Sequence, residues 1–577
     1  MPEFGETTAR AALLAVFLLP ALGAALANLP VGRVAAAAPP LVAAVAWGAS
    51  LYLAAEVRGK TFEWLLGGWG WRIDALAAGA LVVSLGAALA LQLYTFALGS
   101  RRGSGGGAGA VALLSAGAAL VMSGAGGALV LCGLETAALG LLWLHRACGK
   151  GPRVRFQWAV QRLGTAAVAI AYIVGPDSAW AAAGLLAGVV ALWVQTGLAT
   201  GLDRRPGTAY GAAVQLVFAL PVGAYLLLRW NAPLADPPVS LLALLAGGGL
   251  LLAGGFAALR AVDARRLLAC LALAQGGYVL LAVGLAAPDA ALVHLGGAVC
   301  GLLLLGLGAG RVVHALEGRS ALEGMGGLAA YLPLTFWVVL VGGLSLAAVP
   351  PFAGFWTQGE IFVRAYGLGL PGVFALVCLA VPLVAAGAFR FFCLAFFGPP
   401  SAWATRPLVE WPALAALGLV PAAVCCAGAS LWSYPLGDGA LLRLVAGQWA
   451  AGAPVGAGRL SIFELAVVSS GLTAIGLAVS WGRGGAALDP APARPGAGLF
   501  DRAAHACGES VHTAFCRVFA VAEVALLEMA AFVLPASLAA GLARSTEKVL
   551  SPPRGYGGWW TGAGVALFLA YMLWRGG

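Results

Sequence analysis

Charged residues are scarce in this chain. Only 10% of its 577 residues are Asp, Glu, Lys or Arg, whereas 61% are hydrophobic. A soluble domain of this length carries about a quarter charged residues. Apolar runs of roughly 18 or more residues recur from end to end, and each is long enough to cross a bilayer about 30 Å thick. The scarcity of charge therefore excludes a soluble catalytic domain and indicates an integral membrane protein.

Lysine is nearly absent, since the whole chain holds only three, Lys60, Lys150 and Lys548. The formal net charge of +10 therefore comes from arginine. On a soluble protein such a balance favours nucleic-acid binding, but on a membrane protein it reflects arginine in cytoplasmic loops. We therefore expect the lipid bilayer to surround this chain and expect no nucleic-acid partner.

Paired cysteines and nucleotide-binding loops are also missing. The ten cysteines lie singly apart from Cys425-Cys426, and no Cys-x-x-Cys pair or Cys/His ligand spacing occurs. This pattern predicts neither a metal site nor a disulfide framework. No glycine-rich nucleotide loop and no Ser/His/Asp arrangement stands out. We expect no cofactor, no metal and no catalytic residue in this chain, and leave open whether it is a subunit of an enzyme.

The apolar runs predict an all-α membrane protein of about sixteen transmembrane helices. The first run resembles the apolar part of a signal peptide, but it is long for that role and many further runs follow. The predicted spans are 11–29, 34–55, 75–98, 107–124, 126–144, 157–174, 179–198, 208–229, 238–259, 267–286, 290–315, 332–366, 371–397, 411–433, 461–481 and 559–575.

One predicted span, 332–366, is too long for a single straight crossing. Pro350 and Pro351 lie in its middle. Proline removes a helical hydrogen bond, so we predict a broken helix there. Non-helical backbone survives at membrane depth only where protein or water covers it, and broken helices often mark ion or substrate pathways. A tight turn between two short segments explains the prolines equally well.

Basic residues are distributed unevenly between alternate loops. The loops after odd-numbered spans hold most of them, whereas the loops after even-numbered spans hold only Arg58, Lys60, Arg72, Arg443 and Arg459. The positive-inside rule puts the odd-numbered loops in the cytoplasm and the N-terminus outside. We expect a multi-pass protein of the bacterial cytoplasmic (inner) membrane.

The segment after residue 485 differs from the rest. Polar residues recur three or four positions apart between 499 and 534, which is the spacing of one helix face. We predict an amphipathic lateral helix over 499–534, ended by Pro535, that lies along the membrane or against neighbouring subunits. The alternative is a seventeenth span over 518–534, in which Glu523 and Glu528 would be costly in lipid.

Several motifs together resemble one known family, the proton-pumping antiporter-like subunits. These belong to respiratory complex I, the Mrp cation/proton antiporters and membrane-bound hydrogenases. The motifs occur in family order over about residues 60–400, and the most specific are Trp71-Arg-Ile-Asp-Ala-Leu76, Asp263-Ala-Arg-Arg-Leu-Leu-Ala269, Val313-His-Ala-Leu316 and Val349-Pro-Pro-Phe-Ala-Gly-Phe355. The C-terminal part resembles subunit L of NADH:quinone oxidoreductase, which carries a lateral helix.

The resemblance implies five divisions of the chain. They are N-terminal transmembrane helices over 1–105, an antiporter-like core over 106–400, additional transmembrane helices over 401–485, a linker with the lateral helix over 486–550, and a final transmembrane helix over 551–577.

The family is thought to move protons along a polar axis at the bilayer midplane, from a glutamate through several lysines. By resemblance, the candidate proton-path residues are Glu135, Arg162, His294 and Glu360. The other family positions are lost, because they fall on Val190, Gln215, Ala298, Leu302, Gln358 and Gly359. We hypothesise that the chain cannot pump by a lysine relay, because such a relay needs titratable groups. The retained groups form either a shortened path, with Glu135 paired to Arg162, or structural polar contacts.

The resemblance implies a membrane-arm subunit of a complex I-like NADH:quinone oxidoreductase or related respiratory assembly, with proton translocation weakened or lost. Its partners would be other membrane subunits, and a quinone would bind only in a partner subunit. The alternative is a membrane subunit of an ion or inorganic-carbon transporter, either an Mrp-type cation/proton antiporter or a two-component bicarbonate uptake system. The lack of a polar lining argues against a stand-alone channel.

Overall fold

The structure is a computed structural model that describes residues 3–27, 32–57, 60–66, 69–97, 105–148, 152–199, 209–230, 234–398, 413–432 and 462–484. The predicted lateral helix over 499–534, its alternative span over 518–534 and the last predicted span over 559–575 lie outside the described residues.

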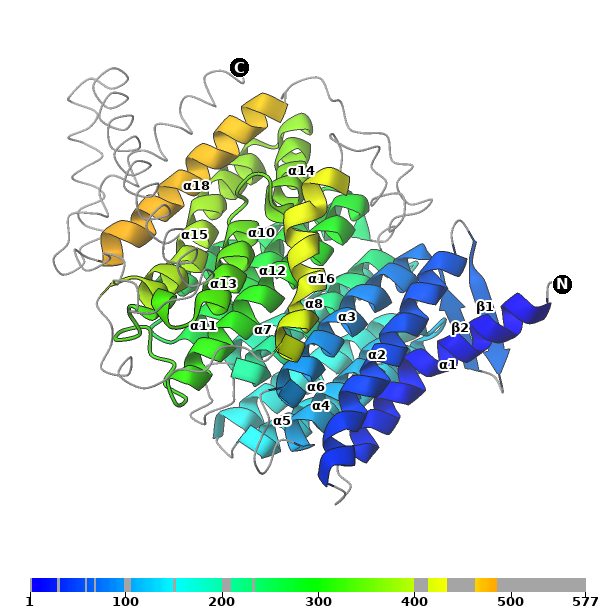
Figure 1. The fold of residues 1–577 in the computed structure, drawn as a ribbon. Coiled ribbons are helices and arrows are strands. Elements are labelled where there is room, and N and C mark those ends of the chain that lie inside the picture. The colour runs from blue at the N-terminus through cyan, green and yellow to red at the C-terminus, as the bar shows by residue number, and fades with distance from the viewer. Residues whose placement is uncertain are drawn as a thin grey trace.

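Helices dominate the described part of the chain (Figure 1). Within lipid a helix satisfies all of its backbone hydrogen bonds internally, and alanine and leucine, which fill these runs, are strong helix formers. The helices are α1 (Glu3–Leu26), α2 (Gly32–Glu56), α3 (Ala75–Ala97), α4 (Gly105–Ser123), α5 (Gly127–Cys148), α6 (Pro152–Val174), α7 (Ala179–Ala199), α8 (Ala209–Arg229), α10 (Pro237–Arg260), α11 (Ala264–Gly284), α12 (Pro288–Ala315), α13 (Pro333–Leu346), α14 (Ala353–Gly367), α15 (Pro371–Phe396), α16 (Ala413–Trp432) and α18 (Ile462–Gly484), with a short 3-10 helix, η2, at Leu328–Ala330.

Eight of the described helices are long and apolar enough to cross a membrane, namely α1, α2, α3, α5, α10, α11, α12 and α15. Seven shorter apolar segments, in α4, α6, α7, α8, α13, α16 and α18, coincide with further predicted spans. The described part of the chain is thus a multi-pass membrane bundle. The total of about sixteen spans stays a prediction from the apolar runs.

One element of the fold is not helical. Strand β1 (Phe62–Leu66) pairs antiparallel with β2 (Trp69–Ile73) between α2 and α3. The all-α prediction missed this hairpin, because it lies between the apolar runs on which that prediction was based. Trp64 and Trp71 stack across the two strands with ring centroids 5.3 Å apart. Such cross-strand aromatic pairs stabilise a small sheet.

Several helix pairs pack with their backbones nearly in contact. Between α4 and α5, a Cβ on Gly133 would lie 2.7 Å from the carbonyl oxygen of Gly117. Between α10 and α11, a Cβ on Gly277 would lie 2.7 Å from the carbonyl oxygen of Gly247. Small residues let spanning helices approach this closely. Close packing therefore accounts for part of the chain's high glycine content.

The helix break predicted within 332–366 is present. Helix α13 ends at Leu346 and α14 begins at Ala353, with Pro350 and Pro351 in the connection. The start of α14 presses on the end of α13, because a Cβ on Gly354 would lie 1.7 Å from a backbone carbonyl oxygen of α13. Only glycine fits at that position.

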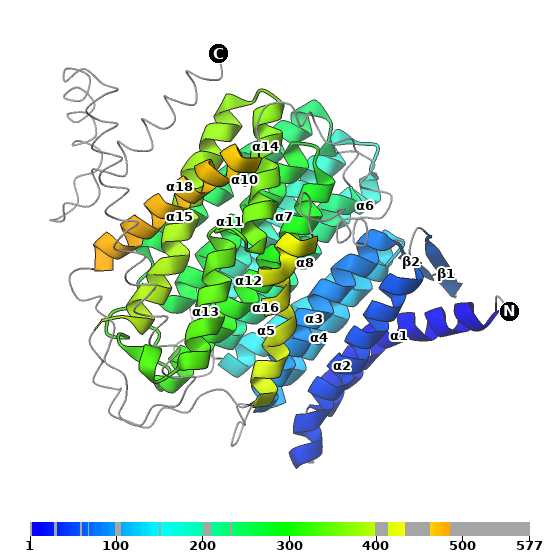
Figure 2. The ribbon, with the colours of Figure 1, turned by 45° about the horizontal axis from the view of Figure 1, so that its top comes forward.

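Helices α16 and α18 cover the bundle in two places (Figure 2). Helix α16 packs against α3 on one side and against α12, α13 and α14 on the other. Its Gly418 lies against Ala90 and Leu93 of α3. Helix α18 packs along α15. Late segments of the sequence therefore contact both an early helix and the broken helix.

Candidate functional site

Two of the predicted site residues form an ion pair in the first half of the bundle. Arg162 Nη1 on α6 lies 2.5 Å from Glu135 Oε2 on α5. The guanidinium is stacked on the Trp158 ring, with its central carbon 4.2 Å from the ring centroid. The side chains of Glu135 and Arg162 remain 48% and 34% exposed. The predicted pairing is present, but it faces away from the bundle.

His294, the third predicted residue, lies in a separate buried cluster. Its Nδ1 is 3.0 Å from the Thr357 hydroxyl on α14, and its ring packs edge-on against Tyr278 of α11 with centroids 5.2 Å apart. Helix α5 packs chiefly on α4 and α6, and α6 chiefly on α5 and α7, so the ion pair lies apart from this cluster. The structure does not join Glu135 to His294.

Gln358, which the sequence analysis aligned with a family lysine, forms a hydrogen bond at the helix break. Its Nε2 donates to the carbonyl oxygen of Leu346, the last residue of α13, at 3.1 Å. Thr473 of α18 donates to the next carbonyl, that of Ala347, at 2.8 Å. The last carbonyls of a helix have no partner within it and need such donors. A neutral amide thus caps the broken helix here.

Three buried polar groups near His294 lack protein partners among the described residues. They are both amide atoms of Gln275, the hydroxyl of Tyr278 and the amide oxygen of Gln358. All three side chains are at most 3% exposed. Buried polar groups of this kind ordinarily bind water. The cluster is therefore polar but carries no ionised side chain among these residues.

Glu360, the fourth predicted residue, lies outside the His294 cluster. It is on the exposed face of α14, within electrostatic reach of Asp289 and Arg364. Arg364 Nη2 lies 3.6 Å from Asp289 Oδ1. Glu360 therefore sits beside a peripheral ion pair and not in a continuous line with His294 and Glu135.

The residues that the sequence analysis aligned with lost family positions are mostly packed into the apolar core. Ala298 and Leu302 on α12 are 3% and 1% exposed. Gly359 is buried on α14, and Val190 on α7 is half-buried against the core. Gln215 lies on α8. No group of three or more His, Cys, Asp or Glu residues within the described ranges is arranged to hold a metal ion.

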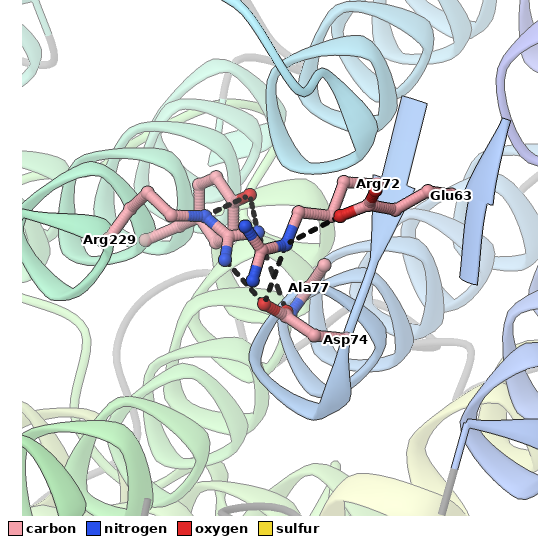
Figure 3. A network of polar contacts seen from close by, with 6 residues as sticks. Glu63, Arg72, Asp74, Ala77 and Arg229 are labelled. Atoms are coloured by element: carbon pink, nitrogen blue, oxygen red, sulfur yellow. Dashed lines mark hydrogen bonds and ion pairs between the residues drawn. The ribbon is translucent and has the colours of Figure 1, made fainter. Parts of the chain in front are cut away.

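A further polar site, which sequence reasoning missed, lies where the hairpin meets the end of α8 (Figure 3). Arg229 Nη1 of α8 is 2.5 Å from Asp74 Oδ2. Asp74 also accepts the Ala77 N–H at 3.0 Å, at the first turn of α3. Arg72 Nε lies 3.8 Å from Asp74 Oδ2 and 3.7 Å from Glu63 Oε1. This network fastens the start of α3 to the end of α8.

The sequence held one indication of this network, because both Asp74 and Arg229 lie in short sequence motifs. Asp74 lies in the Trp71–Leu76 motif and Arg229 ends a Tyr-Leu-Leu-Leu-Arg run, but 155 positions separate them. A cavity of about 190 Å³ adjoins them, lined by Arg72, Tyr172, Tyr225, Arg229 and Trp230 among others. The lining comes from β2 and from the ends of α6 and α8, which therefore share one end of the bundle.

The described residues thus form a bundle of apolar helices with a proline-broken span and a buried polar cluster. Residues 208–382 match the family model described as NADH:quinone oxidoreductase/Mrp antiporter, transmembrane. Over these residues, the match supports the resemblance to this family that the motifs indicated.

Curated relatives match a part of the chain. It is 34% identical over 194 residues to NADH-quinone oxidoreductase subunit L of Campylobacter jejuni, which is 33% of this chain and 32% of that protein. It is 34% identical over 223 residues to subunit L of Escherichia coli K12, which is 38% of this chain and 36% of that protein. The matched segment thus spans about a third of the length of these curated relatives.

Solved structures share the fold over far more of the chain. A chain of the membrane-bound sulfane sulfur reductase, an archaeal respiratory membrane complex, superimposes with a TM-score of 0.69 at 17% identity, covering 98% of this chain and 99% of that one. A chain of respiratory complex I from Thermus thermophilus gives 0.63 at 19% identity, covering 80% and 99%. At these identities the likeness shows a shared fold.

Proposed function

We propose that this chain is a membrane-arm subunit of a complex I-like NADH:quinone oxidoreductase or related respiratory assembly, in which its own proton translocation is weakened or lost. It would lie in the bacterial inner membrane with its N-terminus outside. It would bind neither a cofactor nor a quinone itself. Within this proposal, residues 106–400 form the antiporter-like core and residues 401–485 form additional transmembrane helices.

The observation that carries the proposal is the hydrogen bond of Gln358 at the helix break between α13 and α14. Gln358 occupies the family lysine position and donates its amide N–H to Leu346 O at 3.1 Å. An amide does not titrate, so it cannot take up and release a proton as a lysine can. Leu302, at the other lysine position of this half, is 1% exposed and packed in the core.

The other candidate proton-path residues also support weakened or lost proton translocation, because they lie far apart from one another. Glu135 and Arg162 face outward on α5 and α6, whereas His294 is enclosed between α11, α12 and α14. Arginine does not deprotonate in proteins, so Arg162 can hold a carboxylate but cannot replace a relay lysine. We therefore assign Arg162, His294 and Gln358 structural roles.

The test is proton translocation by the intact assembly in sealed vesicles. We expect His294→Gln and Glu360→Gln to leave the number of protons moved per electron pair unchanged, provided that assembly is normal. A large loss of proton translocation with normal assembly and electron transfer would overturn the proposal. Gln358→Lys is the converse variant, and we expect it to restore no pumping because Leu302 and Val190 still interrupt the relay.

The description of the matched family also covers Mrp antiporters, so an ion or inorganic-carbon transporter is the second candidate. Copurification separates the two. Hydrogenase-like and iron–sulfur subunits bound to the chain support the respiratory assembly. Recovery with Mrp-type membrane subunits alone, or with a single soluble zinc protein, supports the transporter.

A further inference from the structure

The cavity beside Asp74 and Arg229 has a positively charged lining. Arg72 and Arg229 both line it, and no acidic residue in the described part of the chain does. Both guanidinium groups lie against one carboxylate, since Asp74 Oδ2 is 2.5 Å from Arg229 Nη1 and 3.8 Å from Arg72 Nε (Figure 3). The other nearby carboxylate, that of Glu63, is 67% exposed, so water screens its charge. One positive charge at the cavity is thus left without an enclosed counter-charge.

Two hydrogen-bond donors of this lining have no acceptor among the described residues. The Arg72 guanidinium is 3.8 Å from Asp74 and 3.7 Å from Glu63, and both distances are too long for hydrogen bonds. The Tyr225 hydroxyl oxygen accepts from Nε and Nη2 of Arg229 at 3.1 and 2.7 Å, so its own proton remains to be donated. Tyr225 is 1% exposed, and a buried polar hydrogen needs an acceptor.

The cavity lies where apolar helices of the bundle end. Its lining comes from β2, which precedes α3, and from the ends of α6 and α8. Tyr172 and Trp230, which also line it, pack edge to face with ring centroids 5.3 Å apart. Tyrosine and tryptophan are enriched at membrane–water interfaces, at the level of the lipid head groups. The site therefore lies at the depth of phospholipid phosphates and within reach of water.

The size and the donors of the cavity suit a phosphate group. Its volume is about 190 Å³, which is room for roughly six water molecules at about 30 Å³ each. The planar guanidinium of arginine donates two parallel N–H groups to two phosphate oxygens, and this pairing is stronger than a neutral hydrogen bond. Arg72 can bind a phosphate in this way, and the Tyr225 hydroxyl supplies a further donor.

We propose that this cavity binds a phosphate group through the Arg72 guanidinium and the Tyr225 hydroxyl. Arg229 adds positive charge, while its own N–H groups hold Asp74 and Tyr225 in place. The phosphate belongs either to the head group of an anionic phospholipid or to a free phosphate ion, because both present the same oxygens. The inference goes beyond the proposed function and does not depend on it, since either candidate function is compatible with a phosphate site at the membrane surface.

The first test is photolabelling of the protein purified from native membranes together with its copurifying subunits. The probe is a phosphatidylglycerol with a photoreactive head group. We expect label on peptides that contain Tyr172, Pro176 or Trp230 of the cavity wall. Arg72→Gln should reduce this labelling about tenfold, the effect of losing a hydrogen bond to a charged group. Arg72→Lys, which keeps the charge without the paired N–H groups, should give an intermediate loss and also serves if Arg72→Gln folds poorly.

The matched control is Arg10→Gln on α1. The Arg10 side chain is 45% exposed, against 48% for Arg72, but it does not line the cavity. We expect the control to leave labelling of the cavity peptides unchanged. Equal losses in the two variants would mean that surface charge in general attracts the lipid, and the proposal would then be wrong.

The second test distinguishes the two sources of the phosphate by equilibrium binding of radioactive inorganic phosphate. Binding that Arg72→Gln weakens about tenfold, without lipid label at the cavity, assigns the site to the free ion. Lipid label that excess inorganic phosphate does not displace assigns it to a phospholipid head group. Absence of both signals, or signals that Arg72→Gln and Arg72→Lys leave unchanged, overturns the proposal.

Discussion

In the half of the bundle formed by α4 to α8, the charged pair of Glu135 and Arg162 points outward. In the half formed by α10 to α15, the polar groups around His294 are enclosed, and the Gln358 side chain among them is a neutral amide. Both halves contain a helix pair with glycine backbones in contact, α4 with α5 and α10 with α11. The same packing therefore supports two different polar arrangements. One half encloses its polar groups, and the other leaves its charged pair partly exposed.

The largest effect on the comparison of the two halves is expected at Gly354, where α14 contacts α13 in the half formed by α10 to α15. Gly354→Ala places a methyl group 1.7 Å from the Ser345 carbonyl oxygen. The methyl group is attached directly to the α14 backbone and the oxygen belongs to the α13 backbone, so neither can move aside unless the chain shifts. We expect a loss of more than about 3 kcal/mol of stability, at or beyond the upper end of overpacking costs, and little folded protein.

The measurement is the melting temperature and folded yield in detergent. The control is Gly343→Ala on α13, where an added methyl group meets nothing within 4 Å. Similar behaviour of the two variants would mean that the break is not closed by direct contact.

The next largest loss of stability is expected from the Asp74–Arg229 pair at the end of α8. Its side chains are only 12% and 19% exposed. Asp74→Asn leaves the Arg229 guanidinium largely buried without its carboxylate. We expect a loss of about 3 kcal/mol, the lower end for breaking a buried pair. Thermal unfolding checks this against Arg10→Gln, whose exposed pair should be worth less than about 1 kcal/mol. Equal effects would show that the network does not fasten α3 to α8.

A smaller effect is expected from the amide cap. Gln358→Leu leaves the Leu346 carbonyl oxygen without its 3.1 Å donor, and an unsatisfied buried acceptor costs about 1–3 kcal/mol. Thr136→Val on α5 is the comparison from the other half, because it removes a hydrogen bond only to its own helix. The melting temperature should fall clearly for Gln358→Leu and by little for Thr136→Val. If both fall equally, the cap does not stabilise the break.

The smallest effect concerns Ala348 in the same connection, which adopts a left-handed conformation with φ 57°. That conformation costs a residue with a Cβ about 1–2 kcal/mol. We expect Ala348→Gly to raise stability by up to about 1 kcal/mol, because part of the gain is offset by the flexibility of glycine in the unfolded chain. Ala347, with φ −82°, is the matched control, and Ala347→Gly should lower stability. The melting temperatures of the two variants show whether each substitution raises or lowers the stability.

Much of the fold was predictable because lipid constrains it. An apolar run at membrane depth must become a helix, so the predicted spans fall on helices wherever the structure describes them. The break around Pro350 and Pro351 was predictable because proline cannot continue a helix. The replacement of family lysines by Val190, Leu302 and Gln358 stays a prediction from the motif alignment.

The orientation of the polar groups was not predictable. Helices α5 and α6 are apolar on most sides, so no amphipathic stripe indicates which face is outward. The outward position of Glu135 therefore required coordinates. The Asp74–Arg229 contact joins positions 155 apart in the sequence, and no local pattern carries such a distance. The hairpin over 62–73 is too short to stand out beside the long apolar runs.

The contact of α16 with α3 bears on how the protein is made. Helix α3 ends at Ala97, and α16 begins at Ala413, so more than 300 residues are synthesised between them. Until α16 enters the membrane, the α3 surface around Ala90 and Leu93 lacks its final cover. A late helix thus covers an early one, and a ribosome stalled after α15 would leave the α16-facing surfaces of α3, α13 and α14 uncovered.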